Sequence, residues 1–234
     1  MSGLIDLLQA FGILIVGLIA RALLAVIVIA IGALPIAGVL ILVRMSRSAL
    51  DRARGLLTTG HVRWQQGCYY APGHLWLKPD AGGALLVGID DLAQRLLPAI
   101  DNVAVTGEGQ WLKKGETLGT VTCGERSIAL KSPIDGKVVA INPKVRSDPA
   151  TVHRDPYRRG WLLSMKPGTA AYQSFTTGPD AEAWFKEEDR RLTVFLEERL
   201  GLAAADGGEL TMPPHALLSD AAWQEMERQF FSTV

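Results

Sequence analysis

The stretch from Ala22 to Val43 restricts the fold of this chain more than any other feature, because it contains no charged residue. As an α-helix it would be about 33 Å long, which is enough to cross a hydrocarbon core of about 30 Å. A cleaved signal peptide is the alternative, but such peptides have a positively charged start and a shorter apolar stretch. This chain has Asp6 near its start instead. We therefore predict a retained membrane anchor over residues 1–45, with its span at about 22–43.

The residues before this span, 4–20, are also apolar, and two arrangements fit them. A single helix from Leu4 to Val43 would be about 60 Å long, roughly twice the membrane thickness. Either the first stretch is an interfacial or tilted lead-in to one span, or two spans form a hairpin that turns near Arg21. Because no turn residues flank Arg21, the single span with a lead-in is favoured.

Four arginines follow the span at once, and they predict its orientation. They are Arg44, Arg47, Arg52 and Arg54. Positive residues next to a span stay on the cytoplasmic side. We therefore expect the chain in a bacterial inner (cytoplasmic) membrane, with everything after the span facing the cytoplasm.

Small residues inside the span offer a surface for another helix. Ala33 and Ala37 have the small-xxx-small spacing that lets two helices approach closely, and Gly38 lies beside them. These three residues are candidates for contact with integral membrane subunits. Pro35 could equally mark a kink in the span whose freed backbone groups are satisfied by neighbours.

The remaining composition excludes several function classes. The chain has 24 basic and 24 acidic residues, so it lacks the basic excess of a general nucleic-acid binder. The two cysteines, Cys68 and Cys123, are too few for a disulfide scaffold and lack metal-ligand spacing. No histidine pair has metal-binding spacing, and no catalytic set or phosphate-binding loop is found. We expect no enzyme, no catalytic residue, no metal, no cofactor and no small-molecule substrate.

The residues after the span predict a basic juxtamembrane helix and linker over 46–60, followed by a β domain over 61–178. In this domain turn signals recur every 8–12 residues. Short apolar runs lie between them, which is typical of an all-β sandwich or barrel. The clearest runs are Leu85–Ile89, Asn102–Val105, Thr117–Thr122, Ser127–Leu130 and Lys137–Ile141. One helical turn or two interrupts them, with Asp90 as its expected N-cap.

Several motifs in this region resemble, in order and spacing, those of the glycine cleavage system H protein. The resemblance extends over about residues 62–166. The motifs are His74-Leu-Trp76, Val87-Gly-Ile-Asp-Asp-Leu-Ala-Gln94, Lys114-Gly-Glu116, Ser132-Pro-Ile-Asp-Gly136 and Asp155-Pro-Tyr-Arg-Arg-Gly-Trp161. The resemblance implies a mainly β fold, a barrel-sandwich hybrid of the lipoyl and H-protein type. It also implies a hairpin whose tip presents a lipoylated lysine that carries an aminomethyl group between partner enzymes.

The lysine that the resemblance requires is missing. In the family it lies eight residues before the proline of the Ser-Pro motif, and that position is Glu125 here. Lys131 is the alternative attachment point, but it falls within the returning strand. Cys123 beside the expected tip is a poor nucleophile, since an unperturbed thiol is mostly protonated at neutral pH. We therefore expect no lipoyl group.

Two helices are expected in the last segment, 179–234. The first begins at Pro179-Asp180 and ends at Gly201, and we favour its packing on the β domain. The second covers Ser219–Phe231 and carries large apolar side chains at Trp223, Met226, Phe230 and Phe231. Because exposing them would be costly, either the protein's own core or a partner should cover them. They are candidate partner-binding residues.

Three functions fit these expectations. The favoured one is a non-catalytic, membrane-anchored, H-protein-like subunit that has a structural, assembly or docking role in a membrane complex. The second is a true lipoyl carrier that uses Lys131 or another unusual attachment. The third is a membrane-fusion adaptor of an export system, although adaptors usually carry long coiled coils and lie outside the cytoplasm.

Overall fold

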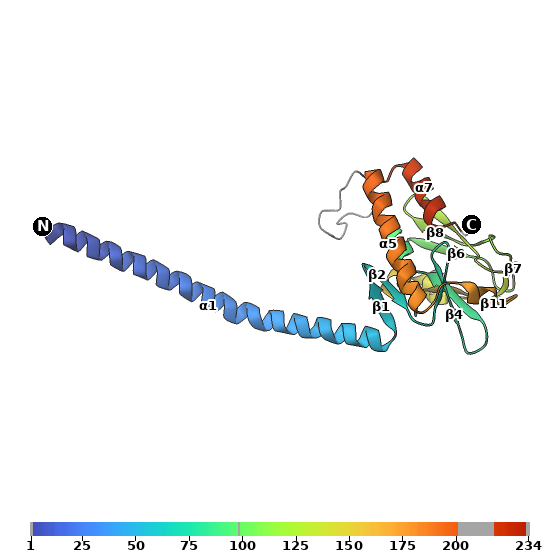
Figure 1. Ribbon diagram of the computed structural model, residues 1–234, viewed down its shortest axis with the longest axis horizontal. Helices are drawn as coiled ribbons and strands as arrows, with labels where there is room; N and C mark the ends of the chain where they lie inside the picture. The colour runs from blue at the N-terminus through green and yellow to red at the C-terminus, as the bar shows by residue number, and fades with distance from the viewer. Residues whose placement is uncertain (1, 98, 201–217, 233–234) are drawn as a thin grey trace. The chain divides into compact units, whose positions relative to one another are not determined.

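The computed structural model describes residues 2–97, 99–200 and 218–232. It divides into two compact units, Met1–Arg54 and Gly55–Val234. The first unit is one helix, α1 (Ser2–Ala53), which Figure 1 draws without a break. Arg21 lies inside this helix, so the alternative of two spans joined by a turn near Arg21 is not adopted. The absence of turn residues around Arg21 accounts for this continuity.

The part of α1 that is long and apolar enough to cross a membrane differs in position from the predicted span. Within the described residues it is Ile31–Ala53, and Leu14–Ala25 forms a shorter apolar stretch. The predicted and observed ranges share residues 31–43. The basic segment that we expected as a separate juxtamembrane helix is the continuation of α1 as far as Ala53.

The second unit contains three antiparallel sheets (Figure 1). β1 and β2 form a two-stranded sheet, β3-β4-β5-β11-β10-β7 a six-stranded one, and β6-β8-β9 a three-stranded one. The bounds are β1 (Leu56–Thr59), β2 (Val62–Gln65), β3 (Tyr69–Ala71), β4 (Leu75–Pro79), β5 (Leu85–Ile89), β6 (Asn102–Val105), β7 (Trp111–Leu112), β8 (Thr117–Cys123), β9 (Arg126–Lys131), β10 (Gly136–Ile141) and β11 (Trp161–Pro167). β1 lies within the range expected to be linker. Its residues form a strand there because they pair with β2.

The strands form where the short apolar runs predict them. β5 and β6 begin and end at the predicted residues, and β8, β9 and β10 extend the predicted runs by one or two residues. β10 alternates between buried and exposed side chains over its first four residues, as a strand with one face on a core must. The sheet-rich fold that the motifs imply is therefore present.

Trp76 is the largest fully buried side chain, and the motif residues around it explain its place. Its indole nitrogen donates to the Ile89 carbonyl at 3.1 Å. Gly88 pairs with Trp76 across β4 and β5, and a Cβ at Gly88 would lie 2.5 Å from the indole ring. The glycine of the Val-Gly-Ile motif is thus required by the tryptophan of the neighbouring strand.

Short helices connect the strands, and two longer ones follow β11. They are α2 (Asp91–Leu96), α3 (Pro143–Ser147), α4 (Thr151–Arg154), the 3-10 helix η1 (Ala171–Ser174), α5 (Pro179–Leu200) and α7 (Asp220–Phe230). The predicted caps are confirmed: Asp90 accepts from the Ala93 amide and Ser219 from the Ala222 amide. The predicted end of α5 at Gly201 lies outside the described residues.

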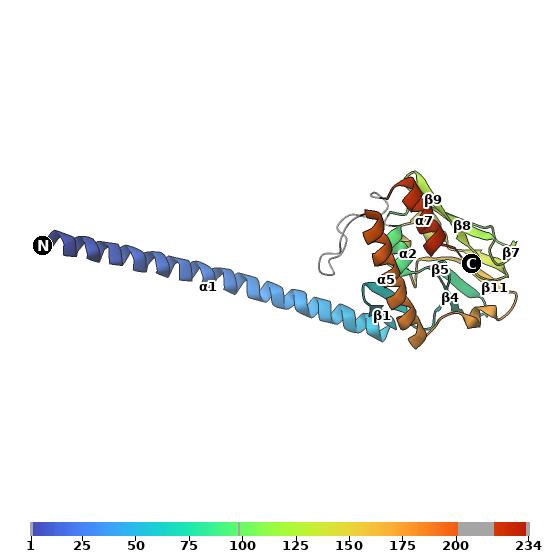
Figure 2. The same ribbon diagram turned by 45° about the horizontal axis from the view of Figure 1, so that its top comes forward.

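α5 and α7 lie side by side on the second unit (Figures 1 and 2), and both bury one face in the common core. The expectation that α5 packs on the β domain is confirmed, with Phe185 fully buried. The apolar residues of the last segment are also covered by the protein itself. Trp223, Met226, Phe230 and Phe231 are each no more than 6% exposed. Their assignment as partner-binding residues is wrong, because α5 and the sheets already cover them.

Candidate functional site at the hairpin tip

The hairpin of β8 and β9 ends in a two-residue turn that contains Glu125. The strands pair up to Cys123 opposite Arg126, which leaves Gly124 and Glu125 as the turn. Gly124 has a φ of 61°, a left-handed conformation that glycine adopts without strain and that tight hairpin turns require. Both turn residues are exposed. The structure thus places Glu125 at the tip of a well-formed hairpin.

Lys131 lies at the other end of this hairpin. It pairs with Thr117 across β8 and β9, and its ammonium nitrogen donates to the Thr117 hydroxyl at 2.9 Å. The side chain is half-buried rather than presented on a turn.

Asp101 and Cys123 lie next to the tip of the hairpin. An Asp101 carboxylate oxygen accepts from the Gly124 amide at 2.6 Å, which fastens the turn to the segment before β6. Burial, and then the negative charge of Asp101, raise the pKa of the Cys123 thiol to about 11. The thiol is therefore protonated and unreactive at neutral pH. This agrees with the expectation that Cys123 is a poor nucleophile.

Arg126 joins the tip to the C-terminal helix. Its guanidinium donates to the Leu218 carbonyl at 3.0 Å and to the Asp220 carboxylate at 2.9 Å. It also lies 5.0 Å from the centroid of the Trp223 ring, a cation–π geometry. α7 therefore begins against the hairpin tip. The sequence holds no local signal for this contact, because its partners are more than 90 positions apart.

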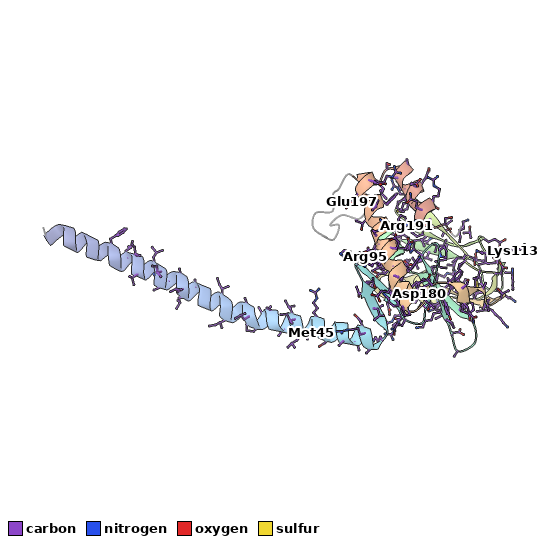
Figure 3. All side chains as sticks on the ribbon, viewed as in Figure 1. Met45, Arg95, Lys113, Asp180, Arg191 and Glu197 are labelled. Carbon is purple, nitrogen blue, oxygen red and sulfur yellow. The ribbon has the colours of Figure 1, made fainter. Side chains whose placement is uncertain are left out.

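A buried charge network lies beneath the two C-terminal helices and was not foreseen. His74 is 2% exposed, and its Nδ1 lies 2.9 Å from an Asp90 carboxylate oxygen. Its Nε2 lies 3.6 Å from Glu188, which pairs in turn with Arg191 at 2.7 Å. The imidazole also packs against the rings of Trp184 and Phe230. Figure 3 labels Arg191 on α5, the helix that supplies both Glu188 and Arg191.

The histidine of this network is held in its charged form. Burial alone would lower the pKa of His74, but the carboxylates of Asp90 and Glu188 raise it from 6.5 to about 9. Burial would raise the pKa of Glu188, but its contacts with His74 and Arg191 lower it. The network thus consists of a cation between two carboxylates, with the guanidinium of Arg191 as the second cation.

Alkaline pH should weaken the fold through this histidine. Since its folded pKa lies above the unfolded value, its stabilisation is complete below about pH 6.5 and is lost as the pH rises through 9. A shift of this size corresponds to about 3 kcal/mol. Unfolding by denaturant at a series of pH values should show this decline. His74→Asn introduces another residue type that tolerates the φ of 57° at this position. In this variant the free energy of unfolding should change less between pH 6.5 and 9. An equal decline in the variant would contradict the assignment.

The other motif residues have structural roles. The Tyr157 hydroxyl donates to the Arg63 carbonyl at 2.7 Å and accepts from the Asp91 amide at 3.1 Å. The Asn142 amide nitrogen donates to the carbonyls of residues 159 and 161. A Cβ at Gly136 would lie 2.6 Å from the Met165 side chain. These motifs hold the strands and loops together and do not form a reactive group.

The remaining predicted residues belong to the first unit. Ala33, Ala37 and Gly38 lie within α1, and their role in helix association stays a prediction. Arg44, Arg47 and Arg52 also lie in α1, whereas Arg54 follows its end, and the orientation that they predict is untested. Within the described residues, no group of three or more His, Cys, Asp or Glu side chains is placed to hold a metal ion.

Known proteins match the second unit. A family model described as glycine cleavage H-protein matches residues 68–188, just over half of the chain. The glycine cleavage system H protein of Opitutus terrae is 42% identical over 97 residues, which cover 42% of this chain and 76% of the relative. That of Bacteroides fragilis is 37% identical over 110 residues, which cover 47% of this chain and 86% of the relative.

A solved structure of a glycine cleavage system H protein from Mycobacterium marinum is also similar. It is 27% identical, covers 53% of this chain and 99% of its own, and has a TM-score of 0.46. The family model spans the hairpin, the buried histidine and most of the motif residues described above. Because that model matches more than half of the chain, and the curated relatives are matched over most of their length, the chain belongs to the glycine cleavage H-protein family.

Proposed function

We propose that this chain is a membrane-anchored H-protein-like subunit without a lipoyl group, and that it has a structural, assembly or docking role in a membrane complex at the cytoplasmic face of a bacterial inner membrane. The observation that carries this proposal is Glu125 at the tip of the β8–β9 hairpin. A glutamate side chain has no amine, so it cannot form the amide by which a lysine holds lipoate. The turn itself is intact, so the exposed tip remains available for protein contact.

The pattern of retained residues also supports a role in binding. Trp76, Gly88 and Tyr157 keep the contacts that hold the fold together. Glu125 occupies the position at which the family motif places the lysine that carries the chemistry. A chain that keeps the fold but not the carrier lysine is suited to recognition by partners rather than to group transfer.

Two features outside the hairpin add to this argument. α1 includes a segment long and apolar enough to cross a bilayer, Ile31–Ala53. Four arginines lie in its last turns or directly after it, and positive residues at that end favour a cytoplasmic position for the second unit. Arg126 holds the start of α7 beside the tip. The hairpin tip is therefore fixed to a helix of the same unit. An anchor in the membrane and a fixed hairpin tip are both consistent with a docking subunit.

Intact-mass measurement tests the absence of lipoate. The full chain, purified from a lipoate-replete host, should have its unmodified mass. Glu125→Lys puts an amine on the exposed turn and is the positive control, expected to gain the mass of one lipoyl group. A lipoyl adduct on the unsubstituted chain would contradict the proposal, and its loss in Lys131→Arg would establish the carrier alternative.

The membrane and subunit parts need a separate test. The chain should stay in the membrane pellet after alkaline carbonate washing and should copurify with integral membrane proteins after mild detergent extraction. A reporter fused after Val234 should be active in the cytoplasm. Recovery of a lone monomer would contradict the subunit role, and a periplasmic reporter would favour the export-adaptor alternative.

A further inference from the structure

Trp111 is unusual among the aromatic residues of the second unit because it is exposed. Its exposed fraction is 56%, and the other large apolar side chains exposed in the described part of this unit are Val139 and Val194. The ring is nevertheless held in place. A Cβ at Gly168 would lie 3.0 Å from it, so the indole rests on the backbone of that glycine. One face of the ring is supported and the side chain is open to solvent.

Two lysines of adjacent strands, here called the lysine row, lie beside this tryptophan. Lys137 pairs with Trp111 across β10 and β7, and with Lys166 across β10 and β11. Both lysines are exposed, and neither forms a salt bridge with a carboxylate of the described residues. Like charges directly opposite each other destabilise a sheet. The free protein therefore carries an unfavourable pair that an added carboxylate would neutralise.

The acidic residues of the nearby turns are occupied elsewhere. Asp135 accepts from the Lys114 amide at 2.7 Å, and Glu116 accepts from the Lys113 amide at 2.8 Å. Glu108 accepts from the Ile141 amide at 3.0 Å. These carboxylates stabilise the turns through backbone N–H groups. The lysine row is consequently left without an intramolecular counter-charge among them.

The position of the row within the second unit favours a protein over a bilayer as its partner. β7 lies at the end of this unit opposite to β1, where the chain enters it (Figures 1 and 2). Figure 3 likewise shows Lys113, directly after β7, at the far end from Arg95. Within this unit, the two lysines therefore lie at the end away from β1, the strand by which the chain enters it.

We propose that Trp111, Lys137, Val139 and Lys166, here called the Trp111 patch, are the docking surface for an acidic segment of a partner protein. Carboxylates of that segment bind the two lysines, and an apolar side chain packs on the indole ring. A fixed tryptophan with apolar and charged neighbours is typical of an interface hot spot, and the lysine pair supplies electrostatic complementarity. The proposal rests on the docking role argued above and specifies its partner's chemistry.

Site-specific photo-crosslinking in cells tests this surface on the full chain. Trp111→p-benzoylphenylalanine should form an adduct with one protein, and the crosslinked peptide should be acidic. The same probe at Val194, which is exposed on α5, is the control and should not form that adduct. Adding Lys137→Glu should reduce the adduct about tenfold or more, the effect of losing about 1.4 kcal/mol of binding energy. Lys137→Arg should retain it.

The charge reversal is designed so that misfolding cannot explain a loss of binding. Lys137→Glu places a carboxylate opposite Lys166, which replaces a repulsive pair by an attractive one. The variant should therefore be at least as stable as the unsubstituted chain in denaturant unfolding. An adduct with lipid or with a second copy, an adduct that survives charge reversal, or no adduct would overturn the proposal. If membrane proteins still copurify in that case, the docking role stands and only this patch is excluded.

Discussion

Asp90→Ala should lower the free energy of unfolding by about 3–5 kcal/mol, the usual cost of removing one partner from a buried ion pair. Asp90 is fully buried and has two functions. One carboxylate oxygen accepts from the Ala93 amide at 2.9 Å as the N-cap of α2, and the other lies 2.9 Å from His74. The alanine leaves the imidazolium with only the more distant Glu188. Unfolding by denaturant with circular dichroism measures the loss.

Two further variants separate these functions. Asp90→Asn keeps a good N-cap but removes the negative charge, so it should recover about 1 kcal/mol of the loss and no more. Asp180→Ala removes an exposed aspartate from the first turn of α5, and it should cost less than about 1 kcal/mol. If Asp90→Ala cost no more than Asp180→Ala, the buried charge network would not stabilise the fold.

Phe230→Ala should destabilise the second unit by about 3–5 kcal/mol, because a large buried aromatic is removed and a cavity remains. Phe230 is 1% exposed, and its ring centroid lies 5.7 Å from that of Phe195 on α5. It also lies beneath the Arg191 guanidinium, 5.4 Å from the ring centroid. The same unfolding measurement applies, with tryptophan fluorescence, to which Trp223 on α7 contributes, as a second signal.

Gln229→Ala is the matched control on the same helix. Its side chain is exposed and bonds only within α7, to Glu225, so the cost should stay within about 0.5 kcal/mol. Should Phe230→Ala prove as mild as Gln229→Ala, the apolar face of α7 would not be part of the core. The earlier interpretation of these side chains as a partner surface would then be restored.

Local patterns predicted much of the second unit because their causes are local. Short apolar runs between turn residues form β5, β6 and β10 wherever one face can be buried. Asp90 and Ser219 cap helices because their side chains reach amides only three residues ahead. The hairpin tip at Gly124 and Glu125 could also be anticipated, since a fixed spacing from Pro133 relates it to the family motif.

The contacts that escaped prediction connect residues far apart in the chain. The Arg126 side chain meets Leu218 and Asp220 only because α7 returns to the β8–β9 hairpin. His74, a lone histidine in the sequence, becomes an ion-pair partner of Glu188 only when α5 covers the β3–β4 turn. Likewise, an apolar helix face such as that of α7 predicts burial but not what buries it, since periodicity carries no information about the covering surface.

The amino-acid sequence therefore determined, without coordinates, an apolar segment before a β domain of the H-protein family, and a glutamate where that family carries its lipoyl lysine. These depend on composition, spacing and local hydrogen bonding. Only the tertiary structure decided that the last aromatic residues belong to the core, that a buried histidine is held between two carboxylates, and that Trp111 stays exposed beside two exposed lysines. These features depend on contacts between segments far apart in the sequence, and only long-range packing determines those contacts.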